Sequence, residues 1–189
     1  MPMEKLNAMP YNLEAEQSLL GCIIIDQENQ TEITNGLYED DFYVPSHKVI
    51  YSAMESIAAS NKPIDIVTLS DALEKSANLE KVGGISYLTT IARSTPSASN
   101  YNYYLDIVKR DGILRRLIKA AEGISKEARS RTDSDSALSS AEKAIFDISE
   151  HLDTSSLEDI KGSYNEVLDK FEKIEKNKDY TSGLKSGYP

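Results

Sequence analysis

The most regular hydrophobic pattern in the chain runs from residue 102 to residue 153 and predicts two consecutive helices. In the first half, apolar residues recur at intervals of three, four and seven, which places them on one helical face; they are Ile107, Leu114, Leu117, Ala121, Ile124 and Ala128. In the second half, the same spacing continues through Leu138, Ala141, Ile145, Ile148 and Leu152. The polar segment 132–135 between them has turn and N-cap chemistry. We therefore expect a long antiparallel helical hairpin over residues 101–153.

The first 100 residues show shorter patterns, which predict a head made of five or six short helices. Their expected starting points are Asn12, Gln30, Ser46, Thr68 and Ile85. Asn12 is a good N-cap, and Thr68-Leu69-Ser70-Asp71 has the form of a capping box. No stretch alternates with a period of two for long enough to predict a strand. The fold class is therefore all-α, with an orthogonal cluster of short helices as the head.

Residues 154–189 predict a separate linker helix. Its apolar stripe is Leu157, Ile160, Tyr164, Val167, Phe171 and Ile174. This stripe is too narrow for a helix that packs into its own globule, and it is too regular to lack a function. We expect it to dock onto a surface that this chain does not contain, and the chain then looks cut rather than finished.

The hairpin stripes also predict self-association. One antiparallel pair of helices has too little surface to bury both of its stripes, and a copy of the same hairpin is the simplest partner. The predicted oligomer interface consists of Ile107, Leu114, Leu117, Ala121, Ile124, Leu138, Ala141, Ile145, Ile148 and Leu152.

Charge limits the possible partners. The chain has a net charge of -10 and a pI near 4.7, which argues against autonomous binding to a phosphate backbone. The first hairpin helix is the exception, because residues 101–131 hold eight Lys or Arg against four Asp or Glu. These cations can form a nucleic-acid footprint, but a solvated face with salt bridges is the commoner reason for such a cluster. They are Lys109, Arg110, Arg115, Arg116, Lys119, Lys126, Arg129 and Arg131.

The candidate chemical groups are few. Cys22 lies in an apolar run and reads as a buried structural thiol. His47 and His151 are the only histidines, and neither has the spacing of a zinc helix. The carboxylates of residues 39–41 read as a solvated run at a helix end. Three tyrosines can stack bases, but packing between head and hairpin is the better explanation; they are Tyr101, Tyr103 and Tyr104.

The C-terminal segment Gly183-Leu184-Lys185-Ser186 resembles the end of a phosphate-binding loop. It lacks glycine directly before the lysine and the second glycine five residues earlier, so it does not predict nucleotide binding. We expect no catalytic, cofactor or metal site in this chain. No apolar run is long enough to span a membrane, and the N-terminus lacks the apolar core of a signal peptide, so we expect a cytoplasmic protein.

A series of short motifs follows one order along the chain: Pro10-Tyr11-Asn12, Glu14-Ala15-Glu16-Gln17-Ser18, Leu20-Gly21, Asp41-Phe42-Tyr43 with His47, Pro63-Ile64-Asp65, Val67-Thr68-Leu69, Gly83-Gly84, Tyr87-Leu88, Pro96-Ser97-Ala98, Tyr104, Ile107-Val108, Leu114-Arg115-Arg116-Leu117 and Ala141-Glu142 with Ile145-Phe146. In these motifs and their order, the sequence resembles the N-terminal domain of bacterial replicative DNA helicases of the DnaB type. The departures are small: Tyr51, Lys62 and Ser99 stand where phenylalanine, glycine and alanine are common in the family.

The resemblance implies a parent that forms a hexameric ring and unwinds DNA with ATP and Mg in a motor domain that this chain lacks. It also implies a collar of hairpin-joined dimers, three of which close the ring, with the C-terminal domain of primase docked outside. A helicase loader and the motor domain of the neighbouring subunit are further implied partners, whereas direct binding of nucleic acid should be weak or absent. The alternative is a self-contained helical oligomer, a scaffold or regulator unrelated to replication. A small helical enzyme is poorly supported, because no pair of titratable groups stands out.

Overall fold

The computed structural model describes residues 8–95, 97–130 and 133–153, and every element in this part of the chain is helical. The elements are α1 (Leu13–Ile25), α2 (Gln30–Thr34), the 3-10 turn η2 (Glu39–Asp41), α3 (Pro45–Ala59), α4 (Ile66–Lys75), α5 (Gly84–Ser94), the 3-10 turn η3 (Ala98–Asn100), α6 (Tyr101–Arg129) and α7 (Ser134–Asp153). The predicted all-α class, the head of short helices and the antiparallel hairpin are confirmed. The predicted linker helix lies outside the described residues.

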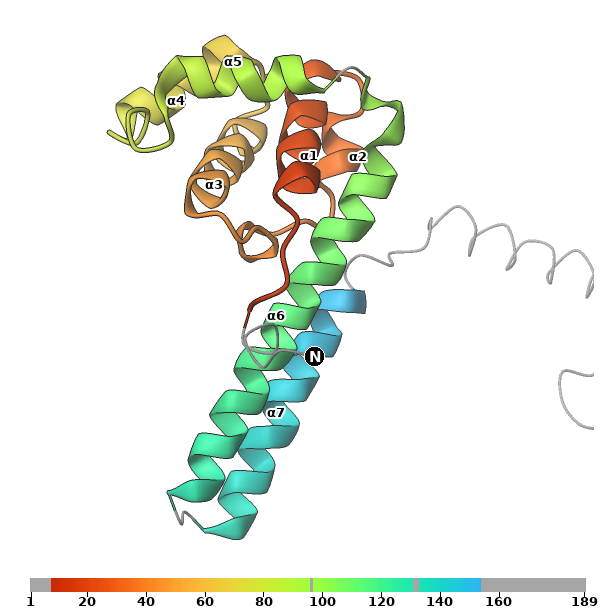
Figure 1. Ribbon diagram of the computed structural model, residues 1–189, viewed down its shortest axis with the longest axis vertical. Coiled ribbons are helices and arrows are strands. Elements are labelled where there is room, and N and C mark those ends of the chain that lie inside the picture. The colour runs from red at the N-terminus through yellow and green to blue at the C-terminus, as the bar shows by residue number, and fades with distance from the viewer. Residues whose placement is uncertain (1–7, 96, 131–132, 154–189) are drawn as a thin grey trace, which may run out of the picture. The chain divides into compact units, whose positions relative to one another are not determined.

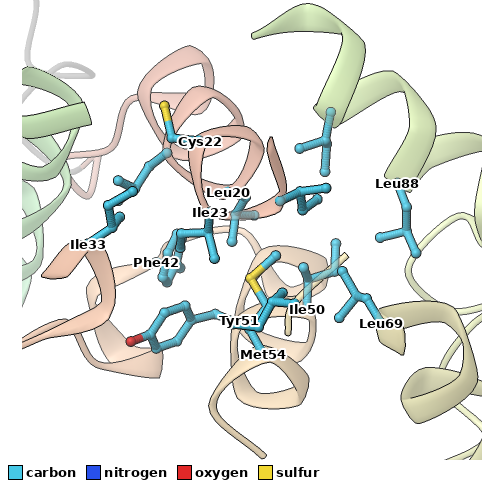
Figure 2. Close-up of a cluster of buried hydrophobic side chains, with 14 of the residues drawn as sticks. Leu20, Cys22, Ile23, Ile33, Phe42, Ile50, Tyr51, Met54, Leu69 and Leu88 are labelled. Atoms are coloured by element: carbon cyan, nitrogen blue, oxygen red, sulfur yellow. The ribbon is translucent and has the colours of Figure 1, made fainter. Parts of the chain in front are cut away.

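Helix α1 is the centre of the head. Its sequence is apolar on nearly all sides, and a helix of that kind must be enclosed. It packs against α5 on one side and against the first half of α6 on another, while α3 and α4 pack against each other (Figure 1). The core is built by side chains from every helix of the head (Figure 2). Its fully buried members include Leu19, Leu20, Ile23, Ile33, Phe42, Ile50, Tyr51, Met54, Leu69 and Leu88.

Helix α2 ends at Thr34, because Asn35 takes an extended conformation with φ -63° and ψ 123°, and Gly36 follows with a positive φ of 66°. One predicted helix start needs correction. Helix α4 starts at Ile66, not at the expected capping box of residues 68–71. Its N-cap is Asp65, which accepts a hydrogen bond from the Thr68 N–H at 2.8 Å while its own N–H donates to Thr68 Oγ1 at 3.0 Å.

A buried glutamine fixes the loop that leads into α4. The Gln30 amide donates hydrogen bonds to the carbonyl oxygens of Ile23 and Ile64, and it accepts one from the Ile64 N–H at 3.1 Å. These carbonyls belong to the end of α1 and to the segment before α4, so one side chain satisfies backbone groups that the helices leave unpaired. At the other end of α1, Asn12 accepts a hydrogen bond from the Ala15 N–H at 3.0 Å, as its predicted role as N-cap requires.

Helix α6 is 29 residues long, and only its first half lies beside the head (Figure 1). Its second half is accompanied by α7, which runs back along it in the opposite direction. No helix in the described ranges combines the length and the apolar character that a membrane span requires.

Candidate self-association surface and head-hairpin junction

The hairpin leaves large apolar side chains uncovered on both of its helices. The exposed fractions are 41 % for Leu114 and 39 % for Leu117 on α6, and 61 % for Leu138, 46 % for Ile145 and 65 % for Phe146 on α7. A soluble monomer exposes single leucines without consequence, but five large apolar residues on one hairpin are typical of a surface that binds another protein.

The structure separates the predicted interface residues into two groups. Leu114, Leu117, Ala121, Leu138 and Ile145 are exposed and available to a second copy. Ile107 instead packs against the head core, Ile148 is buried within its own protomer, and Ile124 and Ala141 are half-buried. These residues contribute to the fold of the single chain, so the available surface is narrower than the sequence pattern predicted.

The remaining predicted residues are not described. The side chain of Leu152 and the whole predicted linker face lie outside the described part, and their roles stay predictions. The undescribed linker residues are Leu157, Ile160, Tyr164, Val167, Phe171 and Ile174. Phe146 was missed because it falls between the positions of the three-four repeat, although an aromatic residue at the edge of an apolar stripe was a usable signal.

The outer face of α6 adds a shallow groove next to the exposed leucines. It has a volume of about 590 Å³, and Ile118, Ala121 and Ser125 lie along its length. Glu122, Lys126 and Arg129 also border it. A groove with a small residue at its centre allows another helix to approach closely.

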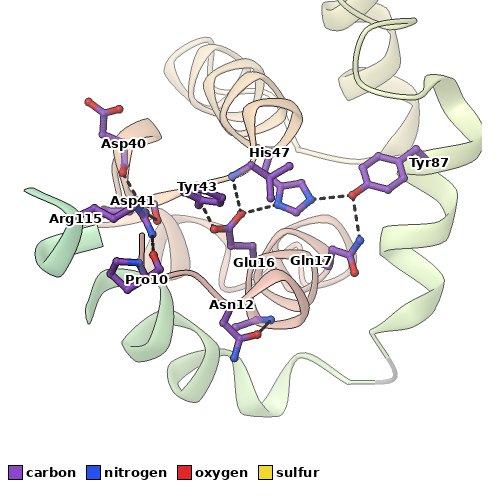
Figure 3. Close-up of polar contacts among 12 residues, drawn as sticks. Pro10, Asn12, Glu16, Gln17, Asp40, Asp41, Tyr43, His47, Tyr87 and Arg115 are labelled. Carbon is purple, nitrogen blue, oxygen red and sulfur yellow. Dashed lines mark hydrogen bonds and ion pairs between the residues drawn. The ribbon is translucent and has the colours of Figure 1, made fainter. Parts of the chain in front are cut away.

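The head and the hairpin are joined by two arginines that the sequence reading placed on a solvated face. Arg115 is only 6 % exposed. Its guanidinium donates hydrogen bonds to the carbonyl oxygens of Pro10 at 2.7 Å and Asp41 at 2.6 Å, with a longer one to Asp40 at 3.4 Å (Figure 3). Arg116 donates to the Asp41 carboxylate at 2.7 Å. The solvated-face interpretation is therefore wrong for these two residues.

Asp41 corrects the reading of residues 39–41 as a solvated acidic run. Its side chain is 1 % exposed, and its carboxylate accepts hydrogen bonds from Arg116 and from the Tyr38 N–H, the latter at 2.9 Å. Asp40 remains exposed, and its hydrogen bond with Lys48 lowers the pKa of its carboxyl group. Desolvation lowers the pKa of the Arg115 guanidinium, although nearby carboxylates partly oppose the shift.

An aromatic pair covers the outer side of this junction. The rings of Tyr11 and Tyr43 are stacked with centroids 4.5 Å apart, and the Arg115 guanidinium lies 5.7 Å from the centroid of Tyr43. The cation-π contact and the carbonyl hydrogen bonds together hold one arginine against two segments of the head, at residue 10 and at residues 40–43. The middle of α6 is thereby tied to the head.

A buried polar network adjoins this junction. Glu16 is 1 % exposed and accepts hydrogen bonds from the N–H groups of Tyr43 at 2.7 Å and Val44 at 3.3 Å. Its carboxylate lies 2.7 Å from His47 Nδ1, and His47 Nε2 lies 2.8 Å from the Tyr87 hydroxyl (Figure 3). Gln17 donates to the same hydroxyl at 3.1 Å.

The directions of two of these hydrogen bonds follow from the Glu16 carboxylate and the Gln17 amide at the two ends of the network. A carboxylate can only accept, so His47 Nδ1 donates to Glu16. The Tyr87 hydroxyl accepts from Gln17 and shares a second hydrogen bond with His47 Nε2. Sequence reasoning missed this network, because Glu16 and His47 are 31 positions apart and each reads separately as a first-turn helix residue.

The burial of Cys22 and of the three tyrosines can be compared with the predictions. Cys22 is fully buried, as predicted. Tyr101 and Tyr104 are half-buried against the head core, as predicted, whereas Tyr103 is 68 % exposed, against the prediction. Across residues 8–95, 97–130 and 133–153, no three His, Cys, Asp or Glu side chains lie close enough to hold a metal ion.

Comparison with known proteins gives one family. Residues 8–110 match the family model described as the DnaB-like helicase N terminal domain. The replicative DNA helicase DnaC of Bacillus subtilis (strain 168) is 39 % identical over 180 residues, which are 95 % of this chain and 40 % of that protein. The chain thus spans about two fifths of the length of this curated relative.

Two solved structures have a similar fold. The N-terminal domain of DnaB helicase from Mycobacterium tuberculosis is 30 % identical, with a TM-score of 0.70 over 74 % of this chain and 99 % of that domain. A structure described as a DnaB-like replicative helicase and its interactions with primase has a TM-score of 0.58 at 21 % identity, over 94 % of this chain and 38 % of the other, and shows a likeness of fold.

Proposed function

This chain belongs to the DnaB-like helicase N-terminal domain family, and from this premise we propose that it is an assembly module of a replicative helicase. In this proposal the hairpins of two copies pack together, and three such dimers close a collar. The family match favours this function over an unrelated helical scaffold. The observation that carries the proposal is the apolar surface that the hairpin leaves exposed.

The test is a pair of charges placed on that surface. Leu117 and Ile145 are 39 % and 46 % exposed in the single chain, so aspartate at these positions should leave the protomer folded. In an interface, each charge would be buried without a partner and would cost several kcal/mol. We expect Leu117→Asp/Ile145→Asp to lower the mass in multi-angle light scattering from an oligomer to a monomer, with an unchanged far-UV circular dichroism spectrum.

The head offers a matched control. Val67 and Ile85 are also large, apolar and exposed, at 75 % and 53 %. They lie in the first turns of α4 and α5, where acidic side chains are favourable. Val67→Asp/Ile85→Asp should therefore retain the wild-type mass. If the hairpin variant kept the wild-type mass, or if both variants lost it, association specifically through the hairpin would be refuted.

We also propose that the assembled collar binds the C-terminal domain of primase. The support is the likeness of fold to a helicase described with its primase interactions, together with the exposed acidic residues of the head. Charge reversal at Glu74 and Glu80 on the head, compared with reversal at Glu122 on the hairpin, assigns the surface in titration calorimetry. Loss only in the head variant is expected, and absence of heat with the assembled wild type would refute the interaction.

Nucleotide and DNA chemistry is proposed to belong to the rest of the parent protein. ATP and Mg would bind in the motor domain, which would also contact the linker helix of a neighbouring subunit, and a helicase loader is a further proposed partner. The purified chain should not turn over ATP, and its binding of single-stranded DNA should be weak and steeply salt-dependent. Nucleotide turnover that persists through further purification would contradict this assignment. A cytoplasmic location stays a prediction.

A further inference from the structure

A cavity of about 500 Å³ lies where the head meets the hairpin. Its volume falls in the range of small-molecule sites, which are about 300 to 1,000 Å³. Part of its lining is apolar and comes from both sides of the junction: Phe42 from the head, Ala120 from α6 and Ile148 from α7. The remainder is mostly charged, and the charges are predominantly positive in a protein that is acidic overall.

Four cationic side chains line the cavity, and their positive charge is only partly neutralised. Lys48 is paired with Asp40, and Arg116 is paired with Asp41. Arg115 donates its hydrogen bonds to uncharged carbonyl oxygens, and the carboxylates of Glu16, Asp111 and Asp41 lie near it. Lys119 forms no ion pair with any described residue.

A further donor at this junction has no acceptor. The Nε–H of Arg116 is buried and forms no hydrogen bond with the described residues. Such a donor is unusual in a native structure. The one uncompensated carboxylate in the lining is Asp147, which forms no ion pair in the described part of the chain. Among the residues that line the cavity, four are cationic and two are acidic.

The aromatic residues at the cavity restrict the type of ligand. The ring of Tyr43 is already stacked on Tyr11 and carries Arg115 over it. The other aromatic ring in the lining, Phe42, is fully buried among core residues. A nucleobase would need a free ring face on which to stack, so the cavity does not favour base recognition.

We propose that this cavity binds a small organic anion, in which a carboxylate or phosphate group is carried on an apolar group. The anionic group would lie against Lys119 and the Arg115-Arg116 pair, and the apolar group would cover Ala120 and Ile148. The site is separate from the exposed leucines and does not depend on the proposed oligomer or on primase. Because the lining comes from head and hairpin together, an occupied site would stabilise the junction.

The experiment uses the wild-type chain and three probes: phenyl phosphate, phenylacetate and inorganic phosphate. Binding is followed by amide chemical shifts in two-dimensional NMR, which also locate the site. We expect the two organic anions to shift resonances of residues 40–43, 115–120 and 144–148, and to bind more tightly than inorganic phosphate. A tighter phenyl phosphate would identify a phosphate site, and a tighter phenylacetate a carboxylate site.

Three variants test the charges. Lys119→Gln should weaken binding about two- to fivefold, the effect of one partly exposed charge, and Asp147→Asn should strengthen it by a similar factor. Lys126→Gln is the matched control, because it removes the same charge from the same helix outside the cavity. Equal effects of Lys119→Gln and Lys126→Gln, no binding of either organic anion, or equal affinity for phenyl phosphate and inorganic phosphate would overturn the proposal.

Discussion

Two glycines on α6 should respond in opposite directions to the same substitution. Gly112 faces the head, and a Cβ built on it would lie 2.5 Å from Asp41 Oδ1 and 3.0 Å from Asp41 Cα. Gly123 lies further along the helix, where an added Cβ meets no atom of the described structure within 4 Å. Alanine is favoured over glycine inside a helix by about 0.8 to 1 kcal/mol, so only the surroundings distinguish the two sites.

The clash at Gly112 has no easy relief. Asp41 is held by Arg116, by the Tyr38 N–H and, through its carbonyl oxygen, by Arg115. One of the close contacts is a backbone atom, so relief requires α6 to move away from the head. Overpacking of this kind costs about 1 to 3 kcal/mol. After the gain in helix propensity, we expect Gly112→Ala to lower the free energy of unfolding by up to about 2 kcal/mol.

The measurement is urea unfolding followed by circular dichroism. All proteins must be compared at one concentration, because self-association makes apparent stability depend on concentration. Gly123→Ala should raise the free energy of unfolding by about 0.8 kcal/mol, which corresponds to roughly 2 to 4 °C in Tm for a chain of this size. Equal stabilities of the two variants would refute the close approach of α6 to Asp41.

Two further outcomes follow from buried groups in the head. Glu16→Gln places an amide among three donors and should lower the free energy of unfolding by about 2 to 4 kcal/mol. The control Glu14→Gln, on the exposed first turn of the same helix, should change it by less than about 1 kcal/mol. Equal urea midpoints of the two variants would contradict the buried network. Burial raises the pKa of the Cys22 thiol to about 11, so its reaction with a disulfide reagent at pH 8 should be over a hundredfold slower than that of the unfolded chain. Because the pKa of the Cys22 thiol is higher in the folded than in the unfolded chain, the free energy of unfolding should also fall as the pH rises from 9 towards 11. Labelling of the native chain as fast as labelling in urea would contradict the burial of Cys22.

Sequence patterns predicted the helices because their signals are local. The N-cap Asn12 and the two helices of the hairpin depend on spacing within one or two turns. The start of α4 shows where local signals become ambiguous. The sequence allows two capping boxes here, one formed by Asp65 with Thr68 and one by Thr68 with Asp71. The structure forms the Asp65–Thr68 box, and Ile64 before it is buried at 1 % exposure.

Buried charges were not predictable in this way, because their partners are distant in the sequence. Arg115 bonds carbonyls 105, 75 and 74 positions earlier, and Glu16 meets His47 across two helices. In each case the residue type favours exposure, and only the tertiary contact makes burial acceptable. The Arg115 side chain was therefore assigned to a solvated face, and the contact between Glu16 and His47 was not predicted.

The two faces of α6 link the fold to the proposed function. The residues that α6 buries are Val108, Asp111, Gly112 and Arg115, whose spacing of three, one and three defines a single helical face. Three of these four are not hydrophobic, yet this is the face that packs against the head. Leucines 114 and 117, which an ordinary amphipathic helix would bury, are about 40 % exposed. Because Arg115 is hydrogen-bonded to carbonyl oxygens of the head, rotating α6 to bury the leucines would leave its buried guanidinium unpaired. The exposed leucines are therefore a fixed property of the folded chain, and a second copy that covers them adds apolar burial without disturbing the junction.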